Sequence, residues 1–304
     1  MPDQQKLDTS KMSVEHKPSE TAMGAATLRA LAALDERKEI RGPDYLAEIF
    51  LTEDRKNALR DPAIRESVIK KRIIPGMYEF LIARTAFFDD IVEQALRENI
   101  PQIVFMGAGY DSRPYRFKDL IRDTRIFELD SQPTQQRKKE LLYQAKVPMP
   151  KQLVFVSINF NTDNIGDVLA KAGFIKNRQV LLVWEGVTYY LSAKVIDDTL
   201  STIRMNSPVG SSICFDYASL SPELQNDHRV KKVREMMKSN YPGEPTHFGI
   251  QKGNIGSFLL ERGYKIIEHL AQNEIERKYL SLNDGSSAGK LLALFCFVHA
   301  LVSD

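Results

Sequence analysis

The chain has 304 residues, of which 43% are hydrophobic and 27% are charged, a composition typical of a globular protein with one large domain or two small ones. Its formal net charge of +2 is too small to indicate binding to nucleic acid or to an anionic membrane surface. The sequence contains no uncharged apolar run of membrane-spanning length, and its first residues lack the apolar core of a signal peptide.

The N-terminal third predicts a polar tail followed by helices. Residues 1–20 are polar and without periodicity, so we expect a mobile tail or a segment that orders as a lid. Ala, Leu and Met recur at helical spacing over 22–40, with Thr21 as candidate N-cap and the pair Gly42-Pro43 as the break. Further helices are expected over 44–51, 54–61 and 76–99.

From residue 102 onward, short apolar runs alternate with amphipathic stretches, which predicts βαβ units and a mostly parallel sheet. The candidate strands are 102–106, 124–129, 153–158, 179–184 and 211–217, and the candidate helices are 131–146, 162–173 and 192–205. Residues 255–270 and 288–303 predict one more helix and two late strands. We therefore predict an α/β fold in one domain over 21–304, with a helical cap over 21–100 and a lid-like insertion over 219–252.

The two cysteines, Cys214 and Cys296, fall in apolar stretches and show neither a disulfide framework nor metal-ligand spacing. We expect buried free thiols, no metal site and a cytoplasmic protein.

A glycine turn directly follows the first predicted strand, in the sequence IVFMGAGYDSRPYRF (103–117). Gly107 and Gly109 allow positive φ and a close approach of a ligand to the backbone. The next strand ends in FELD, which places Asp130 about 20 residues beyond Gly109, where a carboxylate binds ribose hydroxyls. The pattern predicts a nucleotide-type cofactor at the carboxyl edge of the sheet.

The position of the third glycine indicates which cofactor this is. A dinucleotide turn has glycine there so that a helix N-terminus approaches a pyrophosphate, but this chain has Ser112 preceded by Asp111. A carboxylate at that position repels a pyrophosphate and suits a cofactor with an amine and a sulfonium. The charge argument favours S-adenosylmethionine over NAD.

Several motifs, in this order, resemble the leucine carboxyl methyltransferase family in its bacterial branch of S-adenosylmethionine-dependent methyltransferases. They are ETAMGAATLRALAA, RTAFFDD, GAGYDSRPYRF, FELDSQPTQQRKK, SINFNTD, VWEGVTYYLS and FLLERGYKIIEHL. The resemblance covers most of the chain from about Thr21. It implies a Rossmann-like class I methyltransferase sheet, mostly parallel with an antiparallel last strand.

The resemblance also implies roles for the matching positions. Arg84 meets the carboxylate of the cofactor's methionine moiety, Glu185 lies near its amino group, and the glycine turn lies beneath it. Asp130 binds the ribose. Asn159-Phe160 stands where the family usually has Asp-Leu against the adenine, so an acceptor oxygen is kept and a charge is lost.

These positions also have purely structural interpretations, which the sequence leaves open. Arg84 can form an ion pair along its helix with Asp89, Asp90 or Glu93. Asp130 can cap the helix that starts at residue 131. Phe160 and Trp184 can pack in the core instead of stacking on adenine, and the basic run 137–139 is typical of a solvated helix face.

The candidate catalytic residues are Tyr189, Tyr217 and His247. The two tyrosines fall near predicted strand ends, and His247 lies in the insertion as the candidate base for a hydroxyl acceptor. A carboxylate acceptor is already ionised and needs no base. The family implies O-methylation of a carboxylate or hydroxyl. Its eukaryotic members methylate the terminal leucine of a phosphatase, but we expect a small-molecule acceptor here.

Three functions follow in order of preference. The first is an S-adenosylmethionine-dependent O-methyltransferase. The second is a non-catalytic S-adenosylmethionine-binding sensor or partner-binding module, which would bind cofactor without turnover. The third is an NAD-dependent Rossmann oxidoreductase, which the missing third glycine and Asp111 disfavour.

Overall fold

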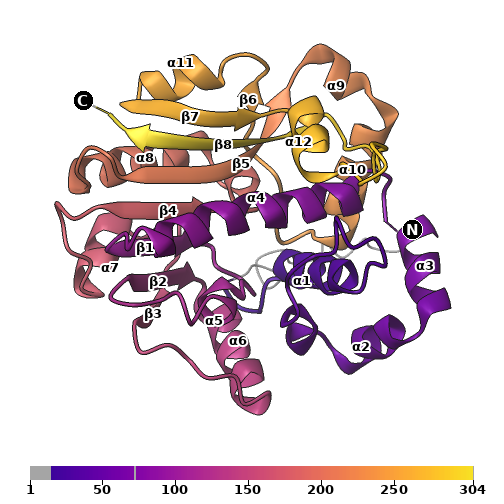
Figure 1. The fold of residues 1–304 in the computed structure, drawn as a ribbon. Coiled ribbons are helices and arrows are strands. Elements are labelled where there is room, and N and C mark those ends of the chain that lie inside the picture. The colour runs from indigo at the N-terminus through magenta and orange to yellow at the C-terminus, as the bar shows by residue number, and fades with distance from the viewer. Residues whose placement is uncertain (1–14, 72, 304) are drawn as a thin grey trace, which may run out of the picture.

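The computed structural model describes residues 15–71 and 73–303, and its centre is a sheet of strand order β3-β2-β1-β4-β5-β8-β7 (Figure 1). The strands are β1 (Gln102–Met106), β2 (Arg125–Asp130), β3 (Leu153–Ser157), β4 (Val180–Trp184), β5 (Ser212–Leu220), β7 (Tyr264–Leu270) and β8 (Phe295–Val302). Strands β1 to β5 pair in parallel, and β8 runs antiparallel between β5 and β7. A short strand, β6 (Ile250–Gln251), pairs with the end of β5. The predicted α/β sheet with one antiparallel strand is confirmed.

Strand β1 is buried along its whole length because both faces of the sheet are covered, and every residue after Gln102 is apolar. Ile103 and Phe105 belong to one core cluster, and Val104 and Met106 belong to the other. Helices α4 (Met77–Arg97), α6 (Gln132–Gln144) and α12 (Gln272–Tyr279) supply side chains to the first cluster, and α7 (Ile165–Lys171), α8 (Ala193–Asn206) and α11 (Ile255–Leu260) to the second. Helix α4 lies within the range predicted as a cap (21–100), but it packs against the sheet.

The remaining helices gather at one end of the sheet (Figure 1). They are α1 (Glu20–Ala33), η2 (Ala47–Phe50), α2 (Glu53–Arg60) and α3 (Pro62–Lys71) before the sheet, and η3 (Thr188–Tyr190), α9 (Pro222–Asn226) and α10 (His228–Asn240) from within it. Because the strand order changes direction between β1 and β4, these segments cover the edge where a doubly wound sheet binds its ligands.

The first helix differs from its prediction at both ends. Ser19, not Thr21, is the N-cap, and its hydroxyl accepts a hydrogen bond from the Ala22 N–H at 3.0 Å. The helix ends at Ala33 because the chain turns back on it, and the Gly42 N–H donates to the Ala32 carbonyl at 2.9 Å. The predicted helix over 44–51 is a single 3₁₀ turn, while α3 and α12 were not predicted.

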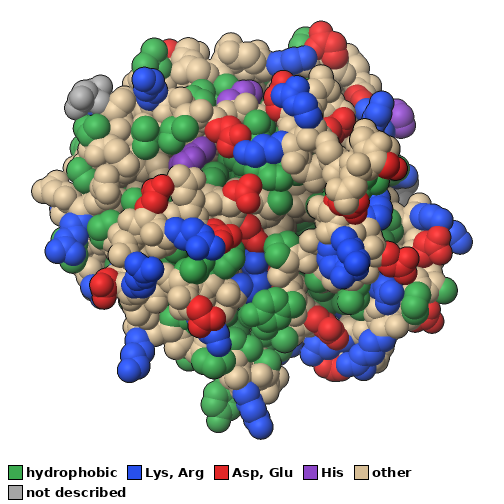
Figure 2. All heavy atoms as spheres, in the orientation of Figure 1, with side chains coloured by type: hydrophobic (Ala, Val, Ile, Leu, Met, Phe, Trp, Pro, Cys, Tyr) green, Lys and Arg blue, Asp and Glu red, His purple; other side chains and the backbone are tan. Residues whose placement is uncertain are grey.

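In the described ranges no helix combines the length and apolar character needed to cross a membrane. On the face drawn in Figure 2, acidic and basic side chains are interspersed. Both predicted thiols, Cys214 and Cys296, are free and buried.

A half-buried histidine in β8, whose Nε2 atom is buried, predicts a pH-dependent stability. Burial lowers the pKa of His299 to about 4, and its Nε2 atom has no hydrogen-bond partner in the described part of the chain. The unfolded chain binds a proton at this position below pH of about 6.5, and the folded chain does not until about pH 4. The fold therefore loses no stability to this histidine above about pH 6.5. As the pH falls from 6.5 toward 4, protonation favours the unfolded chain and the free energy of unfolding decreases.

We expect the parent to lose on the order of 2 kcal/mol more unfolding free energy than His299→Gln between pH 7 and pH 4.5, measured by urea unfolding. Equal losses in the two proteins would contradict this assignment.

Candidate functional site

A cavity of about 1210 Å³ lies between the ends of the parallel strands and the cap. Its wall includes all seven residues assigned to the cofactor from sequence, namely Arg84, Gly107, Gly109, Asp130, Asn159, Phe160 and Glu185. Tyr189 and His247 also line it. A pocket for one small ligand usually measures about 300–1,000 Å³, so this cavity has room for a cofactor and a second molecule.

The glycine turn forms the floor of this cavity. Gly107 has φ 65° and Gly109 has φ 48°, in the left-handed region that favours glycine. A Cβ atom on Gly107 would lie 2.4 Å from Cγ2 of Val187, so no side chain fits there. The helix expected after the turn, α5 (Arg113–Arg116), has a single turn, so little helix dipole points at the cavity.

Asp130 ties the glycine turn to the start of α6. One carboxylate oxygen accepts from the Gly109 N–H at 2.6 Å, and the other accepts from the Ser131 N–H at 2.7 Å. Burial raises the pKa of Asp130, and these N–H donors oppose the rise. The N-cap of α6 is Ser131, so Asp130 supports the helix start from outside while it lines the cavity.

Arg84 points across the sheet end instead of along its own helix. Its Nε lies 3.0 Å from Glu185 Oε1, and its Nη1 donates to Asp216 Oδ2 at 3.3 Å. The predicted alternative of an ion pair with Asp89, Asp90 or Glu93 is therefore wrong. The Nε–H group is close to Glu185 but not aligned for a hydrogen bond, so within the described residues it is a buried donor without an acceptor. A carboxylate bound in the cavity would satisfy it.

Asp216 is a site residue that the sequence did not reveal. It lies fully buried on β5 and accepts hydrogen bonds from the Gly186 N–H at 2.6 Å and from the Tyr189 hydroxyl. Burial, reinforced by Asp216, raises the pKa of Tyr189 well above its ordinary value, so this phenol stays protonated and does not act as a base. The available signal was a lone acid at the end of an apolar strand, SSICFDY.

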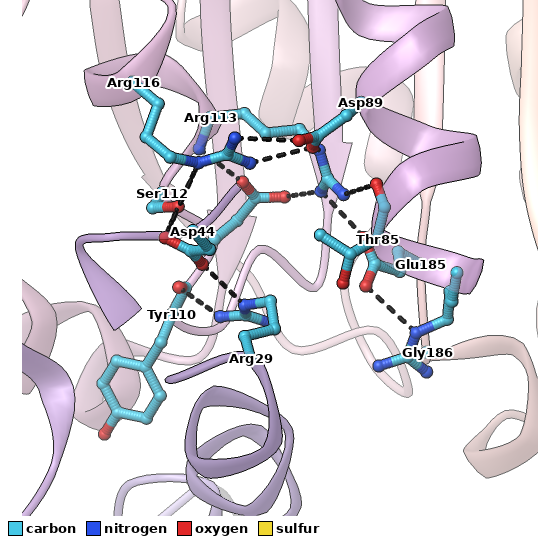
Figure 3. A network of polar contacts seen from close by, with 12 residues as sticks. Arg29, Asp44, Thr85, Asp89, Tyr110, Ser112, Arg113, Arg116, Glu185 and Gly186 are labelled. Carbon is cyan, nitrogen blue, oxygen red and sulfur yellow. Dashed lines mark hydrogen bonds and ion pairs between the residues drawn. The ribbon is translucent and has the colours of Figure 1, made fainter. Parts of the chain in front are cut away.

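A buried arginine, also missed from sequence, links the glycine turn to its neighbours (Figure 3). Arg113 lies 2.6 Å from Asp111, 2.6 Å from Asp89 and 2.7 Å from Glu185. The charge of Asp111 is thus compensated within the protein. Asp111 therefore does not repel a pyrophosphate as the sequence predicted, because Arg113 neutralises its charge.

The adenine-side residues lie at the rim of the cavity. The Asn159 side-chain oxygen accepts from the Asn161 N–H at 2.9 Å, and its amide nitrogen donates to Glu15 at 2.7 Å. Phe160 is half-buried and lines the cavity, whereas Trp184 is buried in the core, edge-on to Phe215. Trp184 therefore packs in the core, which is the structural alternative to stacking on adenine.

Tyr217 is not part of the site, which corrects the sequence prediction. Successive residues of a strand point to opposite faces, so Asp216 faces the cavity side and Tyr217 joins the core cluster on the other face. Its hydroxyl lies 2.9 Å from His269 Nε2. His247 is exposed, and its backbone N–H donates to the Tyr189 carbonyl at 2.6 Å, so these two candidates share one wall of the cavity.

A single carboxylate joins the insertion to the start of α1. Glu244 accepts from the Glu20 N–H at 3.0 Å, the Thr21 N–H at 3.2 Å and the Ser19 hydroxyl at 3.0 Å, and also from the Thr21 hydroxyl. We call this contact the Glu244 latch. It satisfies backbone donors that a helix N-terminus leaves free and holds the two covering segments together.

The strand order, the glycine turn after β1 and the acid at the end of β2 define the class of Rossmann-like, S-adenosylmethionine-dependent methyltransferases. The family model described as Leucine carboxyl methyltransferase matches residues 22–204, and the chain belongs to this family. Its cofactor is S-adenosylmethionine, and the NAD-dependent alternative is set aside.

Two relatives illustrate the family. The "Putative S-adenosyl-L-methionine-dependent methyltransferase YktD" of Bacillus subtilis is 31% identical over 202 residues, which is 66% of each chain. A protein of Streptomyces avermitilis with the same description is 30% identical over 227 residues, covering 74% of this chain and 78% of its own.

Two solved structures share the fold. A DUF574 family protein from Streptomyces avermitilis has a TM-score of 0.60 at 12% identity, covering 95% of this chain and 98% of its own. A structure from Thermobifida fusca, described as "a putative methyltransferase", has a TM-score of 0.56 at 13% identity, covering 98% of this chain and 100% of its own.

The first prediction for the site concerns Asp130. We expect Asp130→Ala to weaken S-adenosylhomocysteine binding by roughly 1–3 kcal/mol in calorimetric titration, because a buried charge-assisted acceptor is lost. Asp130→Asn keeps one oxygen for the Gly109 or Ser131 N–H and should lose less. Unchanged affinity in both variants would contradict the assignment.

The second prediction concerns the Glu244 latch. We expect Glu244→Gln to speed dissociation of S-adenosylhomocysteine roughly tenfold and to increase proteolytic cleavage near residues 15–22 and 240–250, because charge-assisted hydrogen bonds are lost. Glu235→Gln is the control, since Glu235 is an exposed acid on α10 that does not line the cavity. Identical behaviour of the two variants would show that the latch does not hold the cavity closed.

Proposed function

We propose that this methyltransferase transfers the methyl group to a carboxylate or hydroxyl oxygen of a small-molecule acceptor. The observation that carries the proposal is the cavity of about 1210 Å³, which the cap and the insertion cover and which exceeds the space one small ligand needs. A small molecule fits inside this volume beside the cofactor.

The residues that line the cavity bind the cofactor and orient it for the reaction. Arg84 holds the carboxylate of the cofactor, Asp130 its ribose, and the backbone of Gly107 and Gly109 leaves room between them. Bound S-adenosylmethionine supplies a methyl group on a sulfonium, ready for in-line transfer. The protein then contributes alignment and exclusion of water, which are the large terms for such a displacement.

The choice between the two acceptor groups depends on the available bases. Tyr189 stays protonated, and Asp216 and Glu185 are occupied by Arg84. Of the candidate catalytic residues predicted from the sequence, His247 lines the cavity and is the candidate base. A carboxylate acceptor is ionised at neutral pH and uses none of these groups, so we favour it over a hydroxyl.

The test is methyl transfer from labelled cofactor to a set of small carboxylic acids, a set of phenols and alcohols, and a hexapeptide ending in leucine. We expect label in the acids. Treatment with alkali should release it as methanol, because esters hydrolyse under conditions that leave ethers intact. His247→Gln should keep carboxylate methylation within about twofold and lower any hydroxyl methylation by 100-fold or more.

Each remaining result has a distinct meaning. Preferential labelling of the peptide would overturn the small-molecule acceptor. Cofactor binding without transfer to any compound would support the non-catalytic sensor. Two free buried thiols fit a reducing compartment, and we propose a cytoplasmic location on that basis.

A further inference from the structure

The cap and the insertion give the cavity a wall that is mainly apolar. Side chains from α1, from α3, from the joining segment and first residue of α4, and from α10 line the cavity and pack against the core without being fully buried. They are Leu28, Val68, Ile73, Met77, Met236 and Met237. We call this set the apolar wall. Such incompletely covered apolar area favours a ligand with an apolar body, and methionines adapt to its shape.

One half-buried cation in the same wall has no acidic partner among the residues that the structure describes. Arg55, on α2, donates from Nη1 to the Thr27 hydroxyl at 2.8 Å and to the Met23 carbonyl at 3.2 Å. It is half-buried, lines the cavity and forms no ion pair with residues 15–71 or 73–303. Of the other arginines that line the cavity, Arg29 pairs with Asp44 at 2.8 Å and Arg84 with Glu185 at 3.0 Å, while Arg234 of α10 is exposed to solvent.

A second hydrogen-bond donor lines the same cavity. Tyr241 also lines the cavity, and burial raises the pKa of its phenol while the nearby charge of Arg55 opposes that rise. An apolar ligand that fills the cavity would strip water from Arg55 and leave its charge without compensation, which is costly. A ligand that brings an anion to Arg55 avoids this cost and forms a charge-assisted hydrogen bond.

We propose that the acceptor is an amphipathic organic acid whose apolar body covers the apolar wall and whose anionic group binds Arg55. The proposal rests on the proposed function, because it names the class of acceptor for the same cavity. It assigns to Arg55 a role in substrate selection and leaves cofactor binding to the strand ends. A neutral compound of the same size should bind less tightly.

The test uses matched acids and alcohols with the full chain saturated with S-adenosylhomocysteine. Decanoate is compared with 1-decanol, and 2-naphthylacetate with 2-(2-naphthyl)ethanol, by calorimetric titration. We expect at least one acid to bind tenfold or more tightly than its alcohol. Arg55→Leu should weaken the acid roughly 10- to 100-fold and leave the alcohol unchanged, and Arg55→Lys should restore part of the loss.

Two control variants separate charge from packing. Arg60 lies on the same helix, is exposed and contacts Asn57 at 3.1 Å, so Arg60→Leu should bind both acids like the parent. Thr27→Val removes the hydroxyl that accepts from Arg55 but keeps the cation, so it should retain the preference for acids.

The outcomes also distinguish this inference from the proposed function. If the parent binds S-adenosylhomocysteine but neither acid more tightly than its alcohol, the acceptor class is wrong and the cofactor site stands. If Arg55→Leu keeps the full preference for acids, the role of Arg55 is wrong. If the leucine-terminated hexapeptide binds and depends on Arg55 while the acids do not, the anion belongs to a peptide. Failure of the folded parent to bind S-adenosylhomocysteine would instead contradict the function itself.

Discussion

The buried guanidinium of Arg113 is the interaction on which the rest of the site depends. Three carboxylates from different elements converge on it, Asp89 from α4, Asp111 from the glycine turn and Glu185 from the end of β4 (Figure 3). Burial alone would lower the pKa of Arg113, but the carboxylates outweigh it and raise the pKa well above its ordinary value. Breaking a buried pair costs about 3–5 kcal/mol because a charge is left uncompensated. Arg113 therefore fixes the turn, the helix and the strand end relative to one another.

The same network reaches the cap. Asp89 also binds Arg116, the Ser112 hydroxyl donates to Asp44 at 2.5 Å, and Asp44 pairs with Arg29 of α1 at 2.8 Å. Helix α1 is thus held to the region of the glycine turn through Arg29 and to the insertion at its start by the Glu244 latch. Hydrogen bonds and ion pairs therefore connect the cover of the cavity to its floor.

The parts of the site that could be predicted from the sequence are those that local chain geometry determines. Gly107, Gly109 and Asp130 follow directly from two strand ends, and the apolar runs around them identify those strands. Residues whose role depends on a distant partner gave no such signal. Lys138 lies in a basic run that predicts a solvated face, yet it is buried and pairs with Glu128 at 2.7 Å. Glu244 gave no signal for the same reason, since its partners lie more than 200 residues away.

The two halves of the cavity differ in how their charges are balanced. In the half formed by the strand ends the protein pairs its own charges, so this half is organised before any ligand arrives. The half formed by the cap and the insertion is mainly apolar, and its half-buried cation, Arg55, has no acidic partner in the described ranges. When an anionic oxygen accepts a methyl group from a sulfonium, two opposite charges disappear, so the transition state is less polar than the reactants. A cavity wall that keeps water away from the reacting atoms therefore favours transfer to an anion more than transfer to a neutral hydroxyl. A mainly apolar wall with a cation that lacks an acidic partner among the described residues suits the anionic acceptor that we propose.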